Sequence, residues 1–210
     1  MPLFPIFLKL AERPCLIVGA GNVAGEKISS LLHAQAKLTV VAPEALPSVA
    51  AQAQAGHFPW EQRCFAPSDL DGMFLVVAAT SSPEVNHQIF SLASERGILC
   101  NSVDDPPNCD FYFPSIVERG DLQIAISTAG ESPALAQRLR KEIDAQLAPD
   151  LGSWLKQLGE LRREVLQHRG AGEERKVLLH QLASLPLCEL PACPARQLTH
   201  ANDQHSPKRP

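Results

Sequence analysis

Short continuous runs of apolar residues recur along the first half of the chain, and stretches with apolar residues at helical spacing separate them. The runs are Cys15–Val18, Leu38–Ala42, Phe74–Ala79 and Ile98–Val103. Runs of this kind are typical of strands buried on both faces of a parallel sheet. The stretches Glu26–Ala36 and Val85–Ala93 have the spacing of amphipathic helices. Strands and helices in alternation predict an α/β fold with a doubly wound parallel sheet.

The pattern changes after about residue 113. Leu122–Ile126 alternates larger and smaller side chains, as in a strand with one solvated face. Ser132 and Pro133 are typical of a helix N-cap and first helical position, and Leu or Ile recurs at every fourth residue behind them. Two further helices are expected, around Trp154–Val165 and over Glu173–Ala183.

Composition narrows the class of protein. Of the 210 residues 45% are hydrophobic and 20% charged, and the net charge is −4, which excludes disorder throughout. A sequence pI near 6.0 offers no basic field for nucleic acid. No apolar stretch is long enough to span a bilayer and the first residues do not resemble a signal peptide, so we expect a cytoplasmic protein without a membrane partner.

The six cysteines show no C-x-x-C spacing and the seven histidines are scattered. This pattern argues against a structural zinc site, and we predict no metal-ligating residues. Cys15 and Cys100 lie in predicted strands, and we interpret them as small core residues rather than reactive thiols.

A glycine turn, Gly19-Ala20-Gly21-Asn22-Val23-Ala24, directly follows the first predicted strand and precedes a helix. In this G-x-G-x-x-A pattern Gly19 permits a tight turn, Gly21 lets a pyrophosphate approach the backbone, and Ala24 lets helix and strand pack closely. The pattern predicts a Rossmann-like dinucleotide site with phosphates at the helix N-terminus. A tight turn without a ligand is the alternative.

The second predicted strand ends where such folds carry an acidic residue for the adenine ribose. Glu44 is the acid nearest to that end, slightly later than usual. No arginine stands there to hold a 2′-phosphate, which favours NAD over NADP as the cofactor.

Further motifs accompany the glycine turn in a definite order. They are Leu16–Ala24, Ala78–Thr80 with Val85-Asn86 behind it, Asn101–Asp105, Phe113–Val117, Ile126–Gly130 and Ser132–Ala136. With these motifs the chain from about Leu3 to Leu166 resembles the precorrin-2 dehydrogenase/sirohydrochlorin ferrochelatase family, whose members stand alone or form the N-terminal part of siroheme synthase.

The resemblance implies oxidation of precorrin-2 to sirohydrochlorin by NAD+, and many members are also credited with inserting Fe2+ to give siroheme. It implies a homodimer built from an NAD-binding Rossmann domain (1–113), a dimerisation segment (114–150) and a small helical domain (151–185). Composition predicts a disordered tail over 186–210. No methyltransferase module follows in this sequence, so we expect methylation of uroporphyrinogen to belong to another protein.

Asp104 matches the catalytic aspartate of that family. Dehydrogenation of a reduced tetrapyrrole removes a hydride and a proton, and because NAD+ takes only the hydride, a carboxylate near the macrocycle is suited to take the proton or to steer protons during metal insertion. Asp104 also follows a predicted strand at the edge where doubly wound sheets bind ligands. The alternative is a turn carboxylate that caps backbone N–H groups before Pro106, a role that we assign to Asp105.

The resemblance also assigns binding residues. The implied cofactor residues are Gly19, Gly21, Asn22, Val23, Pro43, Glu44 and Thr80. Asn86 and Thr128 are the implied substrate residues, and Thr128 replaces a serine found in some members. For Thr80 and Asn86, capping of a loop is the equal alternative.

Precorrin-2 is a flat plate edged with eight carboxylates, so its binding needs local positive charge. Gly130 lies at the positive N-terminal end of the helix predicted from Ser132. Arginine can hold a carboxylate through two hydrogen bonds, and the candidate cations are Arg119, Arg138, Arg140, Lys141, Arg162 and Arg163. We predict Gly130 and Arg138 as substrate residues, with a solvated helix face as the equal alternative for Arg138 and the favoured one for Arg162 and Arg163.

Two other hypotheses compete with the dehydrogenase. A non-catalytic dinucleotide sensor would need no carboxylate at Asp104 and would bind NAD without a tetrapyrrole. A chelatase that no longer uses NAD would bind the tetrapyrrole alone, and the intact Gly19 and Gly21 argue against it.

Overall fold

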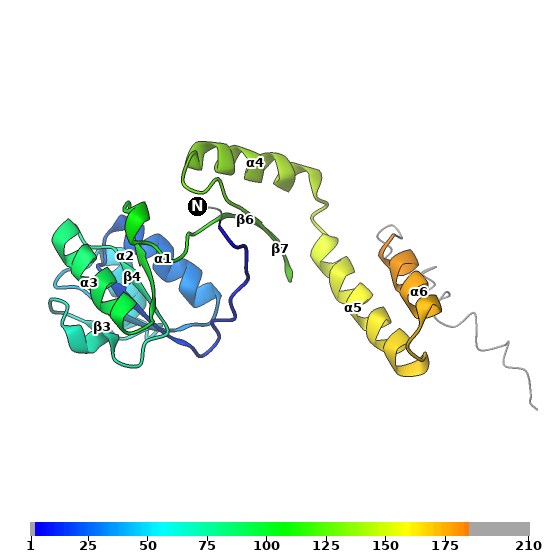
Figure 1. Ribbon diagram of the computed structural model, residues 1–210, viewed down its shortest axis with the longest axis horizontal. Coiled ribbons are helices and arrows are strands. Elements are labelled where there is room, and N and C mark those ends of the chain that lie inside the picture. The colour runs from blue at the N-terminus through cyan, green and yellow to red at the C-terminus, as the bar shows by residue number, and fades with distance from the viewer. Residues whose placement is uncertain (1–2, 185–210) are drawn as a thin grey trace, which may run out of the picture. The chain divides into compact units, whose positions relative to one another are not determined.

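A computed structural model describes residues 3–184 of the chain. Contacts between residues divide the chain into two units, Met1–Phe113 and Pro114–Pro210, which we describe separately (Figure 1). The tail predicted to be disordered, 186–210, lies outside the described residues. The division of the second unit into a dimerisation segment and a helical domain stays a prediction.

The first unit contains a five-stranded parallel sheet in the order β3-β2-β1-β4-β5. Its strands are β1 (Pro14–Val18), β2 (Lys37–Val41), β3 (Trp60–Glu61), β4 (Leu75–Ala78) and β5 (Leu99–Ser102). The doubly wound α/β fold and the four long strands predicted from apolar runs are confirmed. The edge strand β3 was not predicted, because two residues are too few to give a hydrophobic pattern.

Three helices and two short 3-10 turns connect these strands. They are α1 (Asn22–His33), α2 (Pro47–Gln54), α3 (Pro83–Glu95), η1 (Pro67–Leu70) and η2 (Pro106–Asn108). Helix α1 begins at Asn22 rather than at the predicted Glu26, because the helix starts directly from the glycine turn. It ends before the predicted Ala36, since Gln35 turns into the left-handed region with φ of +59°. Helix α2 was missed because Val49 is its one buried residue and leaves no apolar stripe.

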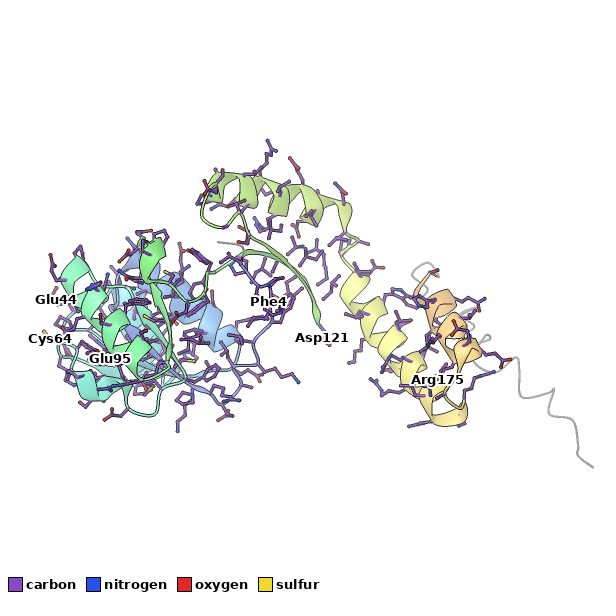
Figure 2. The ribbon with its side chains drawn as sticks, viewed as in Figure 1. Phe4, Glu44, Cys64, Glu95, Asp121 and Arg175 are labelled. Carbon is purple, nitrogen blue, oxygen red and sulfur yellow. The ribbon has the colours of Figure 1, made fainter. Side chains whose placement is uncertain are left out.

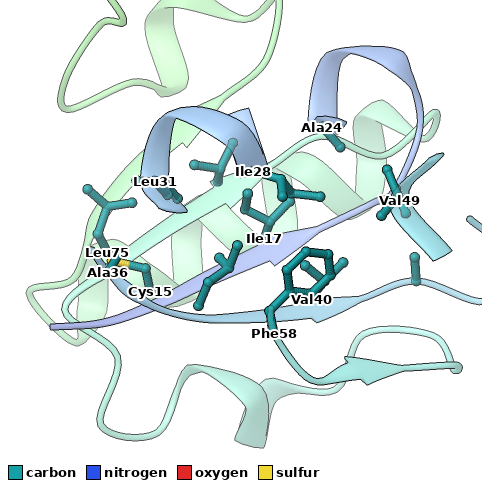
Figure 3. Packing of buried hydrophobic residues seen from close by; sticks show 14 of the residues in the cluster. Cys15, Ile17, Ala24, Ile28, Leu31, Ala36, Val40, Val49, Phe58 and Leu75 are labelled. Atoms are coloured by element: carbon teal, nitrogen blue, oxygen red, sulfur yellow. The ribbon is translucent and has the colours of Figure 1, made fainter. Parts of the chain in front are cut away.

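The sheet has a hydrophobic core on each face, because successive side chains of a strand point to opposite sides. Cys15 and Ile17 of β1 pack with Ile28 and Leu31 of α1 on one face (Figure 3). Leu16 and Val18 pack with Ile89 and Ala93 of α3 on the other face. The prediction that Cys15 and Cys100 are core residues is confirmed, since both are fully buried. Burial raises the pKa of these thiols to about 11 and about 12, which keeps them protonated and unreactive.

The second unit begins with an antiparallel hairpin. Strands β6 (Ser115–Arg119) and β7 (Leu122–Ile126) turn at Gly120-Asp121, and Asp121 marks the tip in Figure 2. The helices α4 (Pro133–Gln146), α5 (Leu151–His168) and α6 (Glu173–Ala183) follow. The predicted β7 and all three helices are confirmed. No helix within residues 3–184 combines the length and the apolar character that crossing a membrane requires.

Helix α5 starts in close contact with the hairpin turn. A Cβ atom added to Gly152 would lie 2.6 Å from the carbonyl oxygen of Arg119 and 2.9 Å from the amide nitrogen of Gly120. Both are backbone atoms, so a side chain at position 152 would require a shift of the main chain. Farther along α5, a Cβ atom on Gly159 would make an ordinary contact of 3.6 Å with the flexible end of Arg163.

These two glycines make a matched pair for a stability experiment. We expect Gly152→Ala to lower the free energy of unfolding by about 1–3 kcal/mol, because the methyl group overpacks a rigid contact. Gly159→Ala should raise it by about 0.5–1 kcal/mol through helix propensity. Urea unfolding followed by far-ultraviolet circular dichroism measures both, and equal effects at the two positions would contradict the contact.

Candidate functional site

The order of the sheet reverses between β1 and β4, so the segments that follow these two strands leave the sheet in opposite directions. Doubly wound folds bind ligands in the crevice at such a point, outside the carboxyl ends of the strands. Val18 pairs with Val41 of β2 and with Ala78 of β4 at these ends. This register brings the glycine turn, the end of β2 and the end of β4 to one edge.

Gly19 lies in direct contact with the loop that follows β4. Its φ is +112°, and a Cβ atom at this position would overlap the carbonyl oxygen of Ala79. The amide of Gly19 donates a hydrogen bond of 2.9 Å to Val41. Glycine is therefore required at position 19 for both its backbone conformation and the close approach of the two loops.

Gly21 differs from Gly19 because no residue in the described range 3–184 occupies the space beside it. Its φ of −82° suits any residue, and a Cβ atom there would meet no heavy atom of these residues within 4 Å. Gly21 is the N-cap of α1, so no side chain caps this helix, and its first turn carries no acidic residue. The N-terminus of α3 is capped instead by the Ser82 hydroxyl, which accepts a bond from the amide of Val85.

The start of α1 consequently fits an anionic ligand such as a pyrophosphate. Uncapped backbone N–H groups and the helix dipole both favour negative charge there. Asn22 and Val23, two of the predicted cofactor residues, are exposed at this end of the helix, and the Val23 side chain is 40% accessible. An apolar side chain so exposed beside the glycine turn offers a surface for a ligand.

Pro43 and Glu44, the predicted ribose contacts, follow β2 at the same edge. Both are exposed, and Figure 2 labels Glu44 at the surface of the first unit. The amide of Leu46 donates a 3.0 Å hydrogen bond to the carbonyl of Ala20, which ties this segment to the glycine turn. A contact of Glu44 with a ribose stays a prediction.

Asn86 and Thr80 bind each other. The Asn86 Oδ1 atom accepts from the Thr80 amide at 3.1 Å and from the Thr80 hydroxyl at 2.7 Å. The Asn86 Nδ2 atom donates to the Thr80 carbonyl at 3.2 Å, and the side chain of Asn86 is 6% exposed. These bonds shape the loop after β4, which corresponds to the loop-capping alternative. Direct contacts of either residue with cofactor or substrate stay predictions.

Asp104 stands exposed two residues after the end of β5, in the left-handed region with φ of +59°. Asp is one of the residue types that tolerate this conformation. Within residues 3–184 its carboxylate has no hydrogen-bond or ion-pair partner. The neighbouring Asp105 has one, because its Oδ2 accepts a bond of 2.6 Å from the Asn108 amide group. The local turn is thus held by Asp105, and the Asp104 carboxylate is left open.

The scaffold around Asp104 was not predicted from the sequence. The Asn101 Nδ2 atom donates to the Phe111 carbonyl at 2.8 Å, and the Asp110 carboxylate accepts from the Cys100 amide at 2.9 Å. The Cys109 thiol donates to the Ser102 carbonyl at 3.1 Å, and burial raises its pKa. These bonds fold residues 105–111 back onto β5. The only signal in the sequence was the cluster of turn-forming Asp, Pro and Asn residues.

The second unit holds the other predicted substrate residues. The Thr128 hydroxyl accepts a 3.2 Å hydrogen bond from the Ser132 amide just before α4. Gly130 has φ of +86° in the same turn. Arg138 is exposed on α4 and forms an ion pair of 3.2 Å with Glu142, one helical turn later. This pairing agrees with a solvated helix face, and a role for Arg138 in substrate binding stays a prediction.

The remaining candidate cations of this unit differ in their surroundings. Arg119 is paired with Asp144 at 2.8 Å and also donates to the Asp144 carbonyl, so it joins the hairpin to α4. Lys141, Arg162 and Arg163 are exposed on helices, and Arg140 is half-buried. In the part of the chain that the structure describes, no group of three His, Cys, Asp or Glu residues is placed to hold a metal ion.

Comparisons with known proteins agree with this geometry. Residues 6–115 match an NAD(P)-binding family model, and residues 119–146 match the model of the sirohaem biosynthesis protein central region. The siroheme synthase of Photorhabdus laumondii is 44% identical over 86% of this chain, and siroheme synthase 1 of Serratia proteamaculans is 41% identical over 84%. These alignments cover 38% and 37% of the two relatives, so the chain spans well under half of their length.

A solved structure resembles the chain over most of its length. The precorrin-2 dehydrogenase SirC superimposes with a TM-score of 0.73 at 25% sequence identity, covering 86% of this chain and 89% of that one. The superposition and the NAD(P)-binding model together identify the first unit as an NAD(P)-binding domain of the Rossmann type.

The open space beside Gly21 leads to a test of cofactor binding. Gly21→Ala should leave the thermal unfolding midpoint unchanged, because its Cβ meets no protein atom. It should weaken NAD+ binding at least about tenfold, because the methyl group stands where a pyrophosphate approaches. Isothermal titration calorimetry measures the affinity. Gly25→Ala is the control on the same helix, since its Cβ makes an ordinary contact of 3.7 Å with Val49. Unchanged NAD+ affinity in Gly21→Ala would refute the assignment.

Proposed function

The chain belongs to the precorrin-2 dehydrogenase/sirohydrochlorin ferrochelatase family, and from this membership we propose that it oxidises precorrin-2 to sirohydrochlorin with NAD+ as the oxidant. The names of its relatives, siroheme synthase and precorrin-2 dehydrogenase, support this step. We also propose a role in it for each residue of the site.

One observation carries the mechanism. An exposed carboxylate without a hydrogen-bond or ion-pair partner in residues 3–184, that of Asp104, follows β5 at the carboxyl edge of the sheet whose β1 end carries the glycine turn. A dehydrogenation removes a hydride and a proton, which need separate acceptors. NAD+, when bound, supplies the acceptor for the hydride. The Asp104 carboxylate is the group suited to take the proton, since its oxygens accept protons and it has no hydrogen-bond or ion-pair partner in residues 3–184.

Other residues of the first unit orient the reactants. The backbone at Gly21 and the start of α1 would hold the pyrophosphate, and Glu44 would accept hydrogen bonds from ribose hydroxyls. The Thr80–Asn86 pair keeps the loop after β4 in the conformation that contacts Gly19. Because contacts within the protein hold both loops, less conformational entropy is lost when a ligand binds.

We also propose that Fe2+ is a second substrate, inserted into sirohydrochlorin by the same protein. Asp104 would then move protons out of the macrocycle as the metal enters. An ion that is handed on to a product needs no tight cage of protein ligands. The lack of a cluster of metal-ligating residues within 3–184 is therefore compatible with iron insertion. We place the protein in the cytoplasm, where free thiols such as Cys64 and Cys109 persist.

A homodimer is the further part of the proposal, and the hairpin β6–β7 supports it. Helix α4 packs against both strands, yet part of the apolar surface of the hairpin stays uncovered. Within the described residues these strands pair only with each other, and Ile116 is 44% exposed on β6 while its neighbour Val117 is buried. A second copy of the chain would cover this apolar side chain.

Sedimentation velocity tests the dimer. The wild-type chain should sediment with twice the monomer mass, and Ile116→Lys should shift the population toward monomer, because a charge cannot be buried without a partner. Val177→Lys, at an equally exposed valine on α6, is the control and should stay dimeric. A wild-type chain that is monomeric at micromolar concentration would contradict the proposal.

The central test is anaerobic oxidation of precorrin-2, with sirohydrochlorin absorbance and NADH fluorescence recorded together. Both signals should rise with the wild-type chain. Asp104→Asn should lower kcat by about 10²–10⁴, the usual contribution of a positioned base. Asp105→Asn is the matched control, since an amide oxygen can still accept the bond from Asn108, and it should keep most of the activity.

Each other outcome favours a different function. If NAD+ binds but neither signal rises, a dinucleotide sensor replaces the enzyme. If sirohydrochlorin binds and accepts iron without dependence on NAD+, the chain is a chelatase. If Asp104→Asn is as active as the wild type, the enzyme stands and Asp104 is not its base.

A further inference from the structure

Lys27 lies at the middle of α1, beside the buried Ile28, and its side chain is held on an aromatic ring. The Lys27 Nζ atom is 4.2 Å from the centroid of the Phe113 ring. This distance is within the range of a cation–π interaction. The family resemblance gave this residue no role, and the amphipathic pattern of α1 did not distinguish it from other lysines.

Phe113 is a fixed platform rather than a mobile side chain. Its ring packs against the core of the first unit and stacks in a tilted arrangement on Phe111, with centroids 5.5 Å apart. The Phe111 carbonyl is in turn bound by Asn101 of β5. The position of the Lys27 ammonium is therefore set by Phe113, which lies two residues after the segment that folds back onto β5.

The electrostatic surroundings connect Lys27 with Asp104. Burial lowers the pKa of Lys27, while the carboxylates of Glu26 and Asp104 raise it. Val103 and Phe113 pack against the same core cluster that contains Ile28, so the residues next to Asp104 and next to Lys27 share one core. The Asp104 carboxylate acts on Lys27 through space. Within residues 3–184 neither side chain forms an ion pair with the other or with any other residue. A partly desolvated ammonium and an exposed carboxylate therefore interact through space without forming an ion pair.

Several other cations of the first unit are bound elsewhere or lie at the opposite edge of the sheet. Arg63 is bound to Asp69 at 2.6 Å, and Arg96 is bound to Asp71 at 2.8 Å. Lys37 begins β2 and Arg13 directly precedes β1, so both lie at the amino edge of the sheet, opposite to the glycine turn. Lys27 is the lysine whose pKa the Asp104 carboxylate raises.

We propose that Lys27 binds a peripheral carboxylate of the tetrapyrrole and so orients the macrocycle toward Asp104. The inference rests on the proposed function and deepens it, by naming a substrate-binding residue of the first unit. A partly desolvated ammonium gains more from an arriving carboxylate than an exposed one does, because less water competes for it. The aromatic platform limits the conformations that the long side chain must give up on binding.

The experiment uses sirohydrochlorin, which keeps the carboxylates of precorrin-2, as the probe for binding. Titration into the full chain, followed by absorbance, should give a Kd about tenfold higher for Lys27→Met than for the wild type. The KM for precorrin-2 should rise by a similar factor with kcat within about twofold, because a contact made equally in ground and transition states changes binding alone. Lys27→Arg keeps the charge and the ring contact, and should restore affinity to within about threefold.

Two controls separate this role from a structural one. The affinity for NAD+ should be unchanged in Lys27→Met, and Lys37→Met should match the wild type in every measurement. A lowered unfolding midpoint with an unchanged sirohydrochlorin Kd would show that Lys27 only fastens Phe113, and would overturn the inference. A Lys27→Arg variant as weak as Lys27→Met would do the same, because charge would then not be the cause.

Measurements on the wild-type chain separate a failure of the proposed function from a failure of the role assigned to Lys27. If it neither binds sirohydrochlorin nor oxidises precorrin-2, the proposed function fails and the role of Lys27 fails with it. If it does both and Lys27→Met binds as well as the wild type, only the inference about Lys27 is wrong.

Discussion

The close approach of Gly19 to the Ala79 carbonyl is the constraint on which the candidate site depends. Two loops that leave the sheet in opposite directions can touch only if one of them lacks a side chain at the crossing point. The contact holds the start of α1 and the start of the loop before α3 at one edge of the sheet. This contact therefore brings the uncapped amides of α1 and the Thr80–Asn86 pair to the same edge of the sheet. The positive φ of Gly19 is a second, independent reason why this position needs glycine.

Around this contact the polar residues divide into those that build the site and those that are left open. Asn86 has every polar side-chain atom bonded to Thr80, and Asp105 is bonded to Asn108. Gly21 and Asp104 are the reverse, since among the residues that the structure describes none fills the space beside Gly21 and none binds the Asp104 carboxylate. Buried polar groups need hydrogen-bond partners within the protein, whereas groups that bind a ligand must be accessible to it. Hydrogen bonds within the protein therefore separate the residues that shape the site from the residues that are candidates for binding a ligand. Position in the sequence does not separate them.

Much of the fold was predictable because its signals are local. The strands around Ile17 and Val76 are continuous apolar runs, and α4 carries an N-cap serine with proline behind it. Helix α2 and strand β3 were not predictable, because a short element with one buried side chain leaves no periodic pattern. The glycine turn and Asp104 were found from motif and position. Lys27 was not, because its significance comes from Phe113 and Asp104, which are distant in sequence and meet only in the folded unit.

The ion pairs remove several cations from those that can attract an anionic substrate. The chain has more acidic than basic residues, and several arginines are already neutralised by carboxylates, among them Arg63, Arg96, Arg119 and Arg138. Exposed pairs of this kind add little stability. Each pair cancels positive potential around its own arginine. An anionic substrate is then attracted by the cations that are not paired with a carboxylate, Lys27 among them, and a site for a polycarboxylate can exist on a protein with a net negative charge.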